Sequence, residues 1–342
     1  MKKISKKSLY ILWIAIFSIF AFSYVVNASE TTTTETIEDG YYTIASALGN
    51  HQVIDIDNAS KNDKANVQIY ASNGTNAQKF KIIKNQDGTY CIINRNSNKA
   101  LDVKDGVAFN GANVWQYTRN GTNAQKWILE DAGEGYYYFV SKLNSKYCLD
   151  VALGKNTSGT NIQIYQKNNT ISQKFKLEKI ASMKSEKTIE NGTYKIVSTL
   201  NETKVLDVAN GSKNQNANIQ LYVDNGTNAQ RFEITYGEDG YYTIINKNSG
   251  KPITTQENNF AERGNVFQGN QVKTDAQKWI IQKNSNGTYT FYSKQSELCI
   301  DVSNGVTTDG NNIWEYTPNG SNSQKFLLVP TTEKLVSNKT LE

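Results

Sequence analysis

Apolar and polar residues along this chain alternate in short runs rather than in helical stretches. The first unit contains four such runs, at residues 41–44, 53–56, 67–70 and 78–82, and Gly, Asn or Asp residues bound them. Runs of this length, with partial alternation and turn residues at their ends, are typical of half-buried strands. No amphipathic helical period of useful length follows residue 30. The pattern therefore predicts an all-β protein.

The same unit of pattern recurs six times. Each copy ends in a polar turn, a glutamine, a basic residue and a large aromatic, written most fully as NGTNAQKW at residues 120–127. The glutamines are Gln78, Gln125, Gln173, Gln230, Gln277 and Gln324, at separations of 47, 48, 57, 47 and 47 residues. A fixed period of this size indicates a repeat architecture. The longer third interval divides the copies into two runs of three.

Three four-stranded units cannot each bury an apolar face alone. Closing three of them around a threefold axis forms one core and removes exposed sheet edges. The aromatics that end the motif are the natural core residues: Phe80, Trp127 and Phe175 in the first run, and Phe232, Trp279 and Phe326 in the second. We therefore expect two tandem β-trefoil domains, with about twelve strands in each.

The domain organisation follows from these repeats and from the segments around them. We expect a signal peptide at 1–28, a polar spacer at 29–38, a first trefoil at 39–182, a linker at 183–190, a second trefoil at 191–330 and a disordered tail at 331–342. The first segment has the basic start, apolar run and small residues near Ala28 of a secretory signal. Because its apolar run is nearly long enough to span a bilayer, an uncleaved anchor is the alternative. Both forms predict export, with membrane contact only through an uncleaved segment.

The net charge of +5 is misleading, because most of it comes from one end of the chain. The N-terminal lysines that supply it are Lys2, Lys3, Lys6 and Lys7, and the other charges are interspersed. Nucleic-acid binding requires a concentrated basic face, which this sequence lacks. We therefore expect no nucleic-acid partner.

Cysteine and histidine content argues against a metal site. The three cysteines are Cys91, Cys148 and Cys299. We expect them to be buried free thiols that behave as small hydrophobes, with a disulfide as the alternative. Because His51 is the single histidine, a Cys/His metal site has no set of ligands.

A second motif precedes the glutamine in five of the six repeats. An aspartate lies 23 residues before the glutamine, and a tyrosine lies 15 residues after the aspartate. The pairs are Asp55 with Tyr70, Asp102 with Tyr117, Asp150 with Tyr165, Asp207 with Tyr222, and Asp301 with Tyr316. In the fifth repeat Thr254 and Gly269 replace the pair, whereas Gln277 and Trp279 remain. Joint loss is expected of two residues that share a ligand. A turn-capping aspartate with a surface tyrosine is the alternative.

An aspartate and a tyrosine at a shallow surface pocket have the chemistry of sugar binding. A carboxylate accepts charge-assisted hydrogen bonds from two vicinal hydroxyls, and a flat aromatic ring stacks on the apolar face of a pyranose. The motif glutamines of the same repeats can hold the aspartates in place as donors, namely Gln78, Gln125, Gln173, Gln230 and Gln324.

The Gln-x-Trp/Phe motif, paired with Leu-Asp-Val at constant spacing, resembles the ricin B-type lectin family over residues 39–330. The resemblance implies a β-trefoil fold and metal-independent binding of galactose-type or other sugars. It places sugar contacts at the five aspartates and five tyrosines, with a further polar contact at Gln68, Gln163 and Gln220. Trp115 and Trp314 take that last position in the other two intact repeats. Many sugar-binding members have Asn before the motif Gln, where this chain has Ala or Ser, so galactose specificity is not carried over.

These observations predict a secreted, multivalent carbohydrate-binding protein that is not an enzyme. Glycosidases need two carboxylates that face each other across a cleft, and no acidic pair outside the repeats suggests one. A nucleophile elbow, a phosphate loop and a zinc motif are also missing from the sequence. We expect glycans as partners and no cofactor. The second hypothesis is a non-lectin trefoil, such as a protease inhibitor or a structural module. The third is a binding subunit of a separately encoded toxin or glycoside hydrolase.

Overall fold

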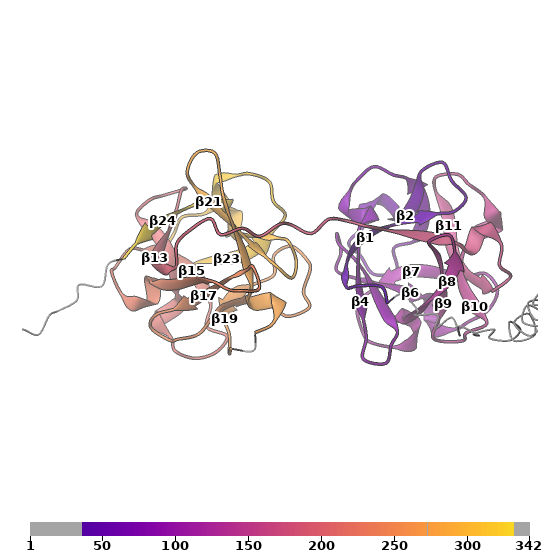
Figure 1. Cartoon of the computed structure of the whole chain (residues 1–342), viewed down its shortest axis with the longest axis horizontal. Helices are drawn as coiled ribbons and strands as arrows, with labels where there is room; N and C mark the ends of the chain where they lie inside the picture. Colours follow the sequence, from indigo (N-terminus) through magenta and orange to yellow (C-terminus); the bar gives the residue numbers. More distant parts are fainter. Residues whose placement is uncertain (1–35, 272, 332–342) are drawn as a thin grey trace, which may run out of the picture. The chain divides into compact units, whose positions relative to one another are not determined.

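The computed structural model of the protein describes residues 36–271 and 273–331 (Figure 1). The predicted signal segment at 1–28, almost all of the predicted spacer and the tail from residue 332 lie outside the described residues. In the described part of the chain, no helix is both long enough and apolar enough to span a bilayer.

Two sets of twelve short strands are present among the described residues. The first set is β1 (Gly40–Ser46), β2 (Gln52–Ile56), β3 (Val67–Ala71), β4 (Phe80–Lys84), β5 (Tyr90–Asn94), β6 (Ala100–Val103), β7 (Ala112–Tyr117), β8 (Trp127–Gly133), β9 (Tyr136–Ser141), β10 (Tyr147–Val151), β11 (Thr160–Gln166) and β12 (Phe175–Lys179). The second set is β13 (Gly192–Ser198), β14 (Lys204–Val208), β15 (Ile219–Val223), β16 (Phe232–Tyr236), β17 (Tyr242–Asn246), β18 (Ile253–Thr255), β19 (Val266–Gln268), β20 (Trp279–Lys283), β21 (Tyr289–Ser293), β22 (Cys299–Val302), β23 (Asn311–Tyr316) and β24 (Phe326–Pro330).

Half of the strands in each set close into a ring of antiparallel pairs. In the first set the ring is β1–β4–β5–β8–β9–β12 and back to β1. In the second set it is β13–β16–β17–β20–β21–β24 and back to β13. The other strands form one hairpin per repeat, and in the first set these hairpins pair with one another through β3–β11 and β7–β11. A closed ring leaves no free strand edge, and the arrangement confirms two tandem β-trefoils.

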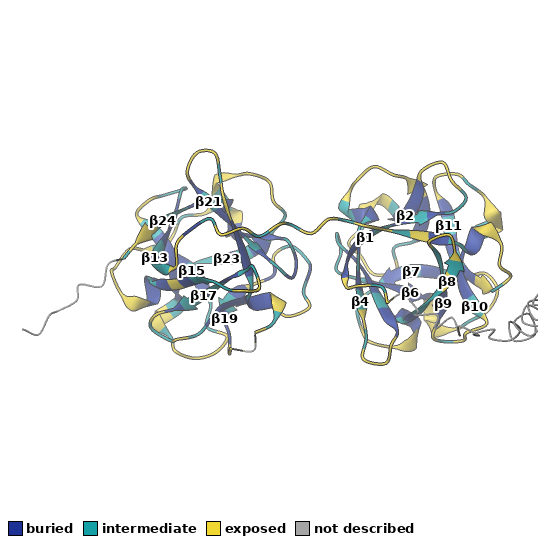
Figure 2. Ribbon diagram, viewed as in Figure 1, coloured by how far each residue is buried: buried dark blue, intermediate teal, exposed yellow. Residues whose placement is uncertain are grey.

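Each domain has its own apolar core, built around the aromatics that end the repeated motif. All six of these side chains are fully buried: Phe80, Trp127, Phe175, Phe232, Trp279 and Phe326. The buried residues follow the strands, and the exposed ones follow the turns (Figure 2). The indole Nε1 of Trp127 donates to the carbonyl oxygen of Leu101 at 3.3 Å, which satisfies its polar atom inside the core. The predicted structural role of the motif aromatics is confirmed.

Short 3₁₀ helices mark two positions of the repeat. One group follows the aspartate strand: η1 (Asp57–Ala59), η3 (Lys104–Gly106), η5 (Ala152–Gly154), η7 (Ala209–Gly211) and η10 (Ser303–Gly305). The other contains the motif glutamine: η2 (Asn76–Gln78), η4 (Asn123–Gln125), η6 (Ile171–Gln173), η8 (Asn228–Gln230), η9 (Asp275–Gln277) and η11 (Asn322–Gln324). The sequence prediction of a strand over 78–82 is therefore wrong at its start. The glutamine belongs to a turn, because its side chain binds the backbone of that turn.

Residues at the edges of the predicted domains also pack on the cores. Ile37 lies against the first core, and Ile189 is part of the second. Next to Ile189, the hydroxyl of Thr188 donates to the carbonyl oxygen of Ile281 at 2.5 Å. The end of the predicted linker is thus held by the second domain. Cys148 and Cys299 are buried and Cys91 is half-buried, and all three are free thiols.

Candidate functional site

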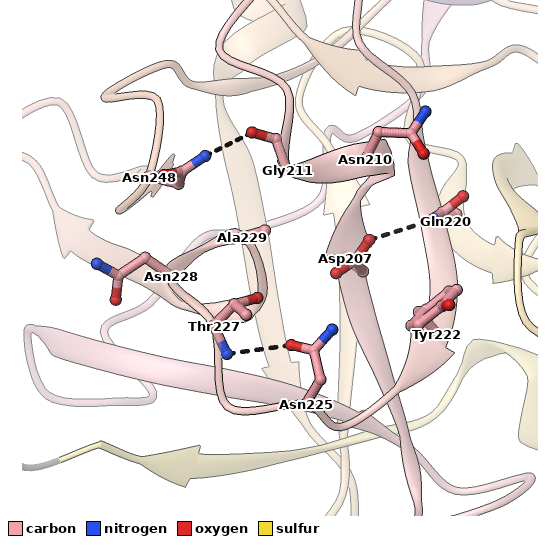
Figure 3. A pocket seen from close by; sticks show the side chains of 10 residues that line it. All are labelled: Asp207, Asn210, Gly211, Gln220, Tyr222, Asn225, Thr227, Asn228, Ala229 and Asn248. Carbon is pink, nitrogen blue, oxygen red and sulfur yellow. Dashed lines mark hydrogen bonds between the residues drawn. The ribbon is translucent and has the colours of Figure 1, made fainter.

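A pocket of about 460 Å³ opens beside the β14–β15 hairpin of the fourth repeat (Figure 3). Asp207 on β14 lies directly opposite Gln220 on β15. Tyr222 follows two residues later, so strand alternation places it on the same face as Gln220. The turn that contains Asn225 and Thr227 forms another side of the pocket. The sequence-predicted Asp, Gln and Tyr of this repeat therefore meet at one cavity.

The polar turn keeps its shape through its own side chains. The side-chain oxygen of Asn225 accepts the backbone N–H of Thr227 at 3.1 Å, which forms an Asx turn. The intervening Gly226 has a φ of 73°, which glycine adopts without strain. The NGTNAQ sequence is thus suited to a tight turn that borders the pocket.

The five aspartates share one setting. Each is only 5% or 6% exposed, and its Oδ1 accepts a hydrogen bond from the side chain directly opposite on the next strand. The donors are Gln68 at 2.9 Å, Trp115 at 2.6 Å, Gln163 at 3.0 Å, Gln220 at 2.9 Å and Trp314 at 2.7 Å. Each carboxylate is therefore fixed in orientation and keeps lone pairs that no strand neighbour uses.

Burial and hydrogen bonding act in opposite directions on these carboxyl groups. Burial raises the pKa of all five, and the donors from Gln or Trp lower it by a smaller amount. The second oxygen also has partners in some repeats. The Oδ2 of Asp102 accepts from Gln125 at 3.0 Å, and that of Asp150 accepts from the Ser172 hydroxyl at 3.2 Å.

The motif glutamines lie below the pockets rather than at their surface. Those of the five intact repeats are at most 2% exposed. Gln173 is representative: its Nε2 donates to the carbonyl oxygen of Gln166 at 3.0 Å, and its Oε1 accepts the backbone N–H of Asn168 at 2.9 Å. This clamp fixes the turn, and the Gln125 donation adds direct support to an aspartate. The structure thus places these residues behind the aspartates, where they orient the site.

The fifth repeat has lost the aspartate and the tyrosine for a reason that includes packing. The hydroxyl of Thr254 donates to the carbonyl oxygen of Thr255 at 3.0 Å, inside the fold. A Cβ atom placed on Gly269 would lie 2.8 Å from the methyl group of Thr254. The two replacements therefore fit each other sterically. Their joint occurrence has a packing cause in addition to the shared-ligand argument from the sequence.

The pocket of the second repeat differs from that of the fourth. It has a volume of about 500 Å³ and is lined by Asp102, Trp115 and Tyr117, together with Lys64 from the first repeat. The Trp115 and Tyr117 rings stack with centroids 6.1 Å apart and planes at 27°. Trp314 and Tyr316 repeat this geometry at 6.0 Å and 25°. Sequence analysis did not single out Lys64. The signal that could have found it is its position nine residues after Asp55, where three repeats have glycine.

Comparison with known proteins gives a match to one family along most of the chain. The family described as ricin-type beta-trefoil lectin domain-like matches residues 29–117, 84–165, 171–270 and 275–340. A comparison with curated proteins gives no match.

Several solved structures are also similar. The designed threefold-symmetric protein ThreeFoil is 35% identical, with a TM-score of 0.40 over 42% of this chain and 100% of that chain. The Rhizoctonia solani agglutinin is 21% identical, with a TM-score of 0.39 over 43% of this chain and 100% of that one. The Macrolepiota procera ricin B-like lectin, solved in complex with lactose, is 17% identical, with a TM-score of 0.37 over 42% of this chain and 99% of that one.

Proposed function

We propose that this chain, which belongs to the ricin-type beta-trefoil lectin domain-like family, is a multivalent carbohydrate-binding protein with sites in five of its six repeats. The observation that carries the proposal is the recurrence of one arrangement. A buried aspartate, fixed by the side chain opposite, lies beside a tyrosine that reaches the surface, as with Asp55 and the 42% exposed Tyr70.

The chemistry of this arrangement suits a sugar. The free lone pairs of the carboxylate accept hydrogen bonds from two neighbouring hydroxyls, and these bonds are strengthened by the negative charge. The tyrosine ring covers the apolar face of the pyranose and fixes its orientation. Since the carboxylate is already held by its neighbour, little side-chain freedom is lost on binding.

A single shallow site of this kind binds weakly, and the presence of several sites on one chain compensates for the low affinity of each. Linking several sites on one chain raises the apparent affinity for a repetitive glycan by roughly 10² to 10⁴, provided that two sites can engage at once. The proposed partners are therefore polysaccharides or dense surface glycans rather than free monosaccharides. The sugar is of galactose type or another pyranose.

The test is a variant in which all five aspartates are changed to asparagine. Asparagine keeps the size of the side chain but removes its charge, so we expect binding to a glycan array to disappear while the thermal unfolding transition remains. The matched control is Thr254→Ala in the fifth repeat, which should bind as the wild type does. Undiminished binding by the fivefold variant would place the sites elsewhere.

We also propose that the protein acts outside the cell that makes it. The support is the sequence of residues 1–28, which lie outside the described residues. Expression of the full chain in a secreting host should release a protein whose first residue is Ser29. Retention of the unprocessed chain inside the host would contradict export.

A further inference from the structure

The pocket of the second repeat is completed across a repeat boundary by Lys64, and the backbone makes the same crossing throughout both domains. In all six repeats, the residue nine positions after the aspartate position has a left-handed φ and donates its backbone N–H to a hairpin of another repeat in the same domain. The six donors are Lys64, Gly111, Gly159, Asn216, Arg263 and Gly310, with N···O distances of 2.7 to 3.0 Å. The acceptor is always the residue 14 positions after the aspartate position of the receiving repeat. We refer to these donors as the bridging residues.

The bridging residue varies with the side chain that holds the aspartate. Where the aspartate is held by Gln68, Gln163 or Gln220, the bridging residue is glycine, and a Cβ atom on that glycine would lie 3.7 to 4.0 Å from the glutamine Oε1. Where the aspartate is held by tryptophan, the bridging residue is cationic. The Nζ of Lys64 lies 5.8 Å from the Trp115 ring centroid, and the guanidinium of Arg263 lies 5.5 Å from that of Trp314.

These two combinations offer different chemistry to a ligand. A glutamine that donates one N–H to the aspartate still has a second N–H and an oxygen for hydroxyl groups. An indole has one donor, which Trp115 and Trp314 already give to their aspartates at 2.6 and 2.7 Å. The tryptophan pockets therefore lack that hydrogen-bonding capacity. In its place they have a cation next to the aromatic rings.

The cations are available to a ligand. Lys64 lines the second-repeat pocket, and a second cation, the Nζ of Lys104, lies 5.8 Å from the same indole. Within the described residues, neither Lys64 nor Arg263 takes part in an ion pair. The Asp102 and Asp105 carboxylates also line this pocket, so the two lysines balance the two acidic groups, and Lys64 is the cation that reaches the cavity.

We propose that the tryptophan pockets of the second and sixth repeats bind acidic sugars, whose carboxylate or sulfate group is held by Lys64 or Arg263. The glutamine pockets of the first, third and fourth repeats bind neutral sugars. This inference rests on the proposed carbohydrate binding and adds a class of ligand to it. Both anionic groups accept charge-assisted hydrogen bonds from lysine and arginine, while the aspartate accepts from ring hydroxyls.

Two variants separate the pocket classes. The first variant disables the glutamine pockets and keeps the tryptophan pockets; it combines Asp55→Asn, Asp150→Asn and Asp207→Asn. The second variant disables the tryptophan pockets and keeps the glutamine pockets; it combines Asp102→Asn and Asp301→Asn. The probes are glucose, galactose, their uronic acids and their 6-sulfates, all coupled to the same carrier. We expect the first variant to prefer the acidic probes by at least tenfold and the second to prefer the neutral ones. The uronic acid and sulfate arms then show which anionic group is bound.

Exchange of the bridging residue tests the cation directly. Lys64→Gly with Arg263→Gly, added to the variant that keeps only tryptophan pockets, should reduce acidic binding tenfold or more. It should also weaken the dependence of that binding on NaCl concentration, to which Lys104 still contributes. Glycine accepts a left-handed φ without strain, so the fold is preserved. Acidic binding that survives this exchange, or equal binding of neutral probes by the tryptophan pockets, would overturn the inference. A folded wild-type protein that binds none of the probes would instead contradict the proposed function itself.

Discussion

Buried carboxyl groups occur in two settings in this protein. Asp102 and Asp207 each line a surface cavity, whereas Glu315 on β23 is fully buried. Its Oε1 accepts the hydroxyl of Ser296 at 2.5 Å, and among the described residues its Oε2 has no hydrogen-bond partner. Gln116 and Gln268 stand at the equivalent position of two other repeats, and each amide donates to two backbone carbonyls. Glu315 thus occupies a place suited to a donor, and only its protonated form can donate.

Protonation of Glu315 should couple the stability of the second domain to pH. Burial raises the pKa of the Glu315 carboxyl from its ordinary value of 4.5 to about 8. Because the folded state holds this proton more tightly than the unfolded state, its contribution to stability is complete below about pH 4.5 and is lost progressively up to about pH 8. The loss is about 1.4 kcal/mol per pH unit in that window. Chemical denaturation at several pH values measures this slope.

The control is Glu315→Gln, which supplies the amide that the equivalent positions have. This variant should be more stable than the wild type at pH 8, by about 1–3 kcal/mol, and its stability should be less dependent on pH. A wild type and a variant with identical pH profiles would show that Glu315 is not protonated in the folded protein.

Sugar binding should weaken on acidification, and the weakening should begin at a higher pH than it would for an aspartate with an ordinary pKa. Only the ionised carboxylate gives charge-assisted bonds to hydroxyls, and burial raises the pKa of Asp207 and its counterparts. The same raised pKa means that protonation of these groups does not destabilise the folded state. Glycan binding measured from pH 7 down to pH 4 should therefore fall before the protein unfolds. Loss of binding only together with unfolding would argue against the aspartates as ligands.

The stability of this fold depends on the hydrogen bonds of the motif turn as well as on the pairing of its strands. Replacing Gln173 by alanine removes a donor and an acceptor that pair with two partly buried backbone groups of the turn. We expect a loss of about 1–3 kcal/mol in the free energy of unfolding, since each of the two lost hydrogen bonds contributes about 0.5–1.5 kcal/mol. The same change at Gln277, in the repeat without the aspartate, should also destabilise the protein but leave glycan binding intact. Calorimetry and a glycan array measure the two effects separately.

The sequence predicts a feature of this fold when the residues that form it lie within one repeat, and it does not when they come from different repeats. The 47-residue period identifies the repeats, and the buried aromatic at Trp127 identifies the core, because both are encoded within one repeat. The contact between Lys64 and Trp115 joins two repeats, and spacing within a repeat does not show which loop completes which pocket. The same limit explains why Thr254 and Gly269 suggest only a lost ligand until their atoms are placed side by side.

At the scale of the whole molecule, the two trefoils have separate cores and unequal numbers of intact repeats. The first core comprises residues between Tyr42 and Phe175, and the second comprises residues between Ile189 and Phe326. Because each ring of strands closes on itself, a domain on its own buries the same core. We expect residues 29–184 and residues 185–342, expressed separately, each to unfold in one cooperative thermal transition.

These separate domains allow the number of sites to be counted. The first domain retains the Asp–Tyr pair in all three repeats, whereas the second has lost it in the fifth. Titration calorimetry with a saturating monovalent sugar that both pocket classes accept should therefore give three sites for the first domain and two for the second. On a dense glycan surface the intact chain should bind more tightly than either domain, by a factor within the roughly 10² to 10⁴ expected of linked sites.

Restoring the fifth pair requires Thr254→Asp together with Gly269→Tyr, because a side chain at residue 269 collides with the threonine methyl group. The double variant should raise the second domain to three sites, while Gly269→Tyr alone should destabilise it without adding one. A second domain that already binds three sugars would show that the pair does not define the site.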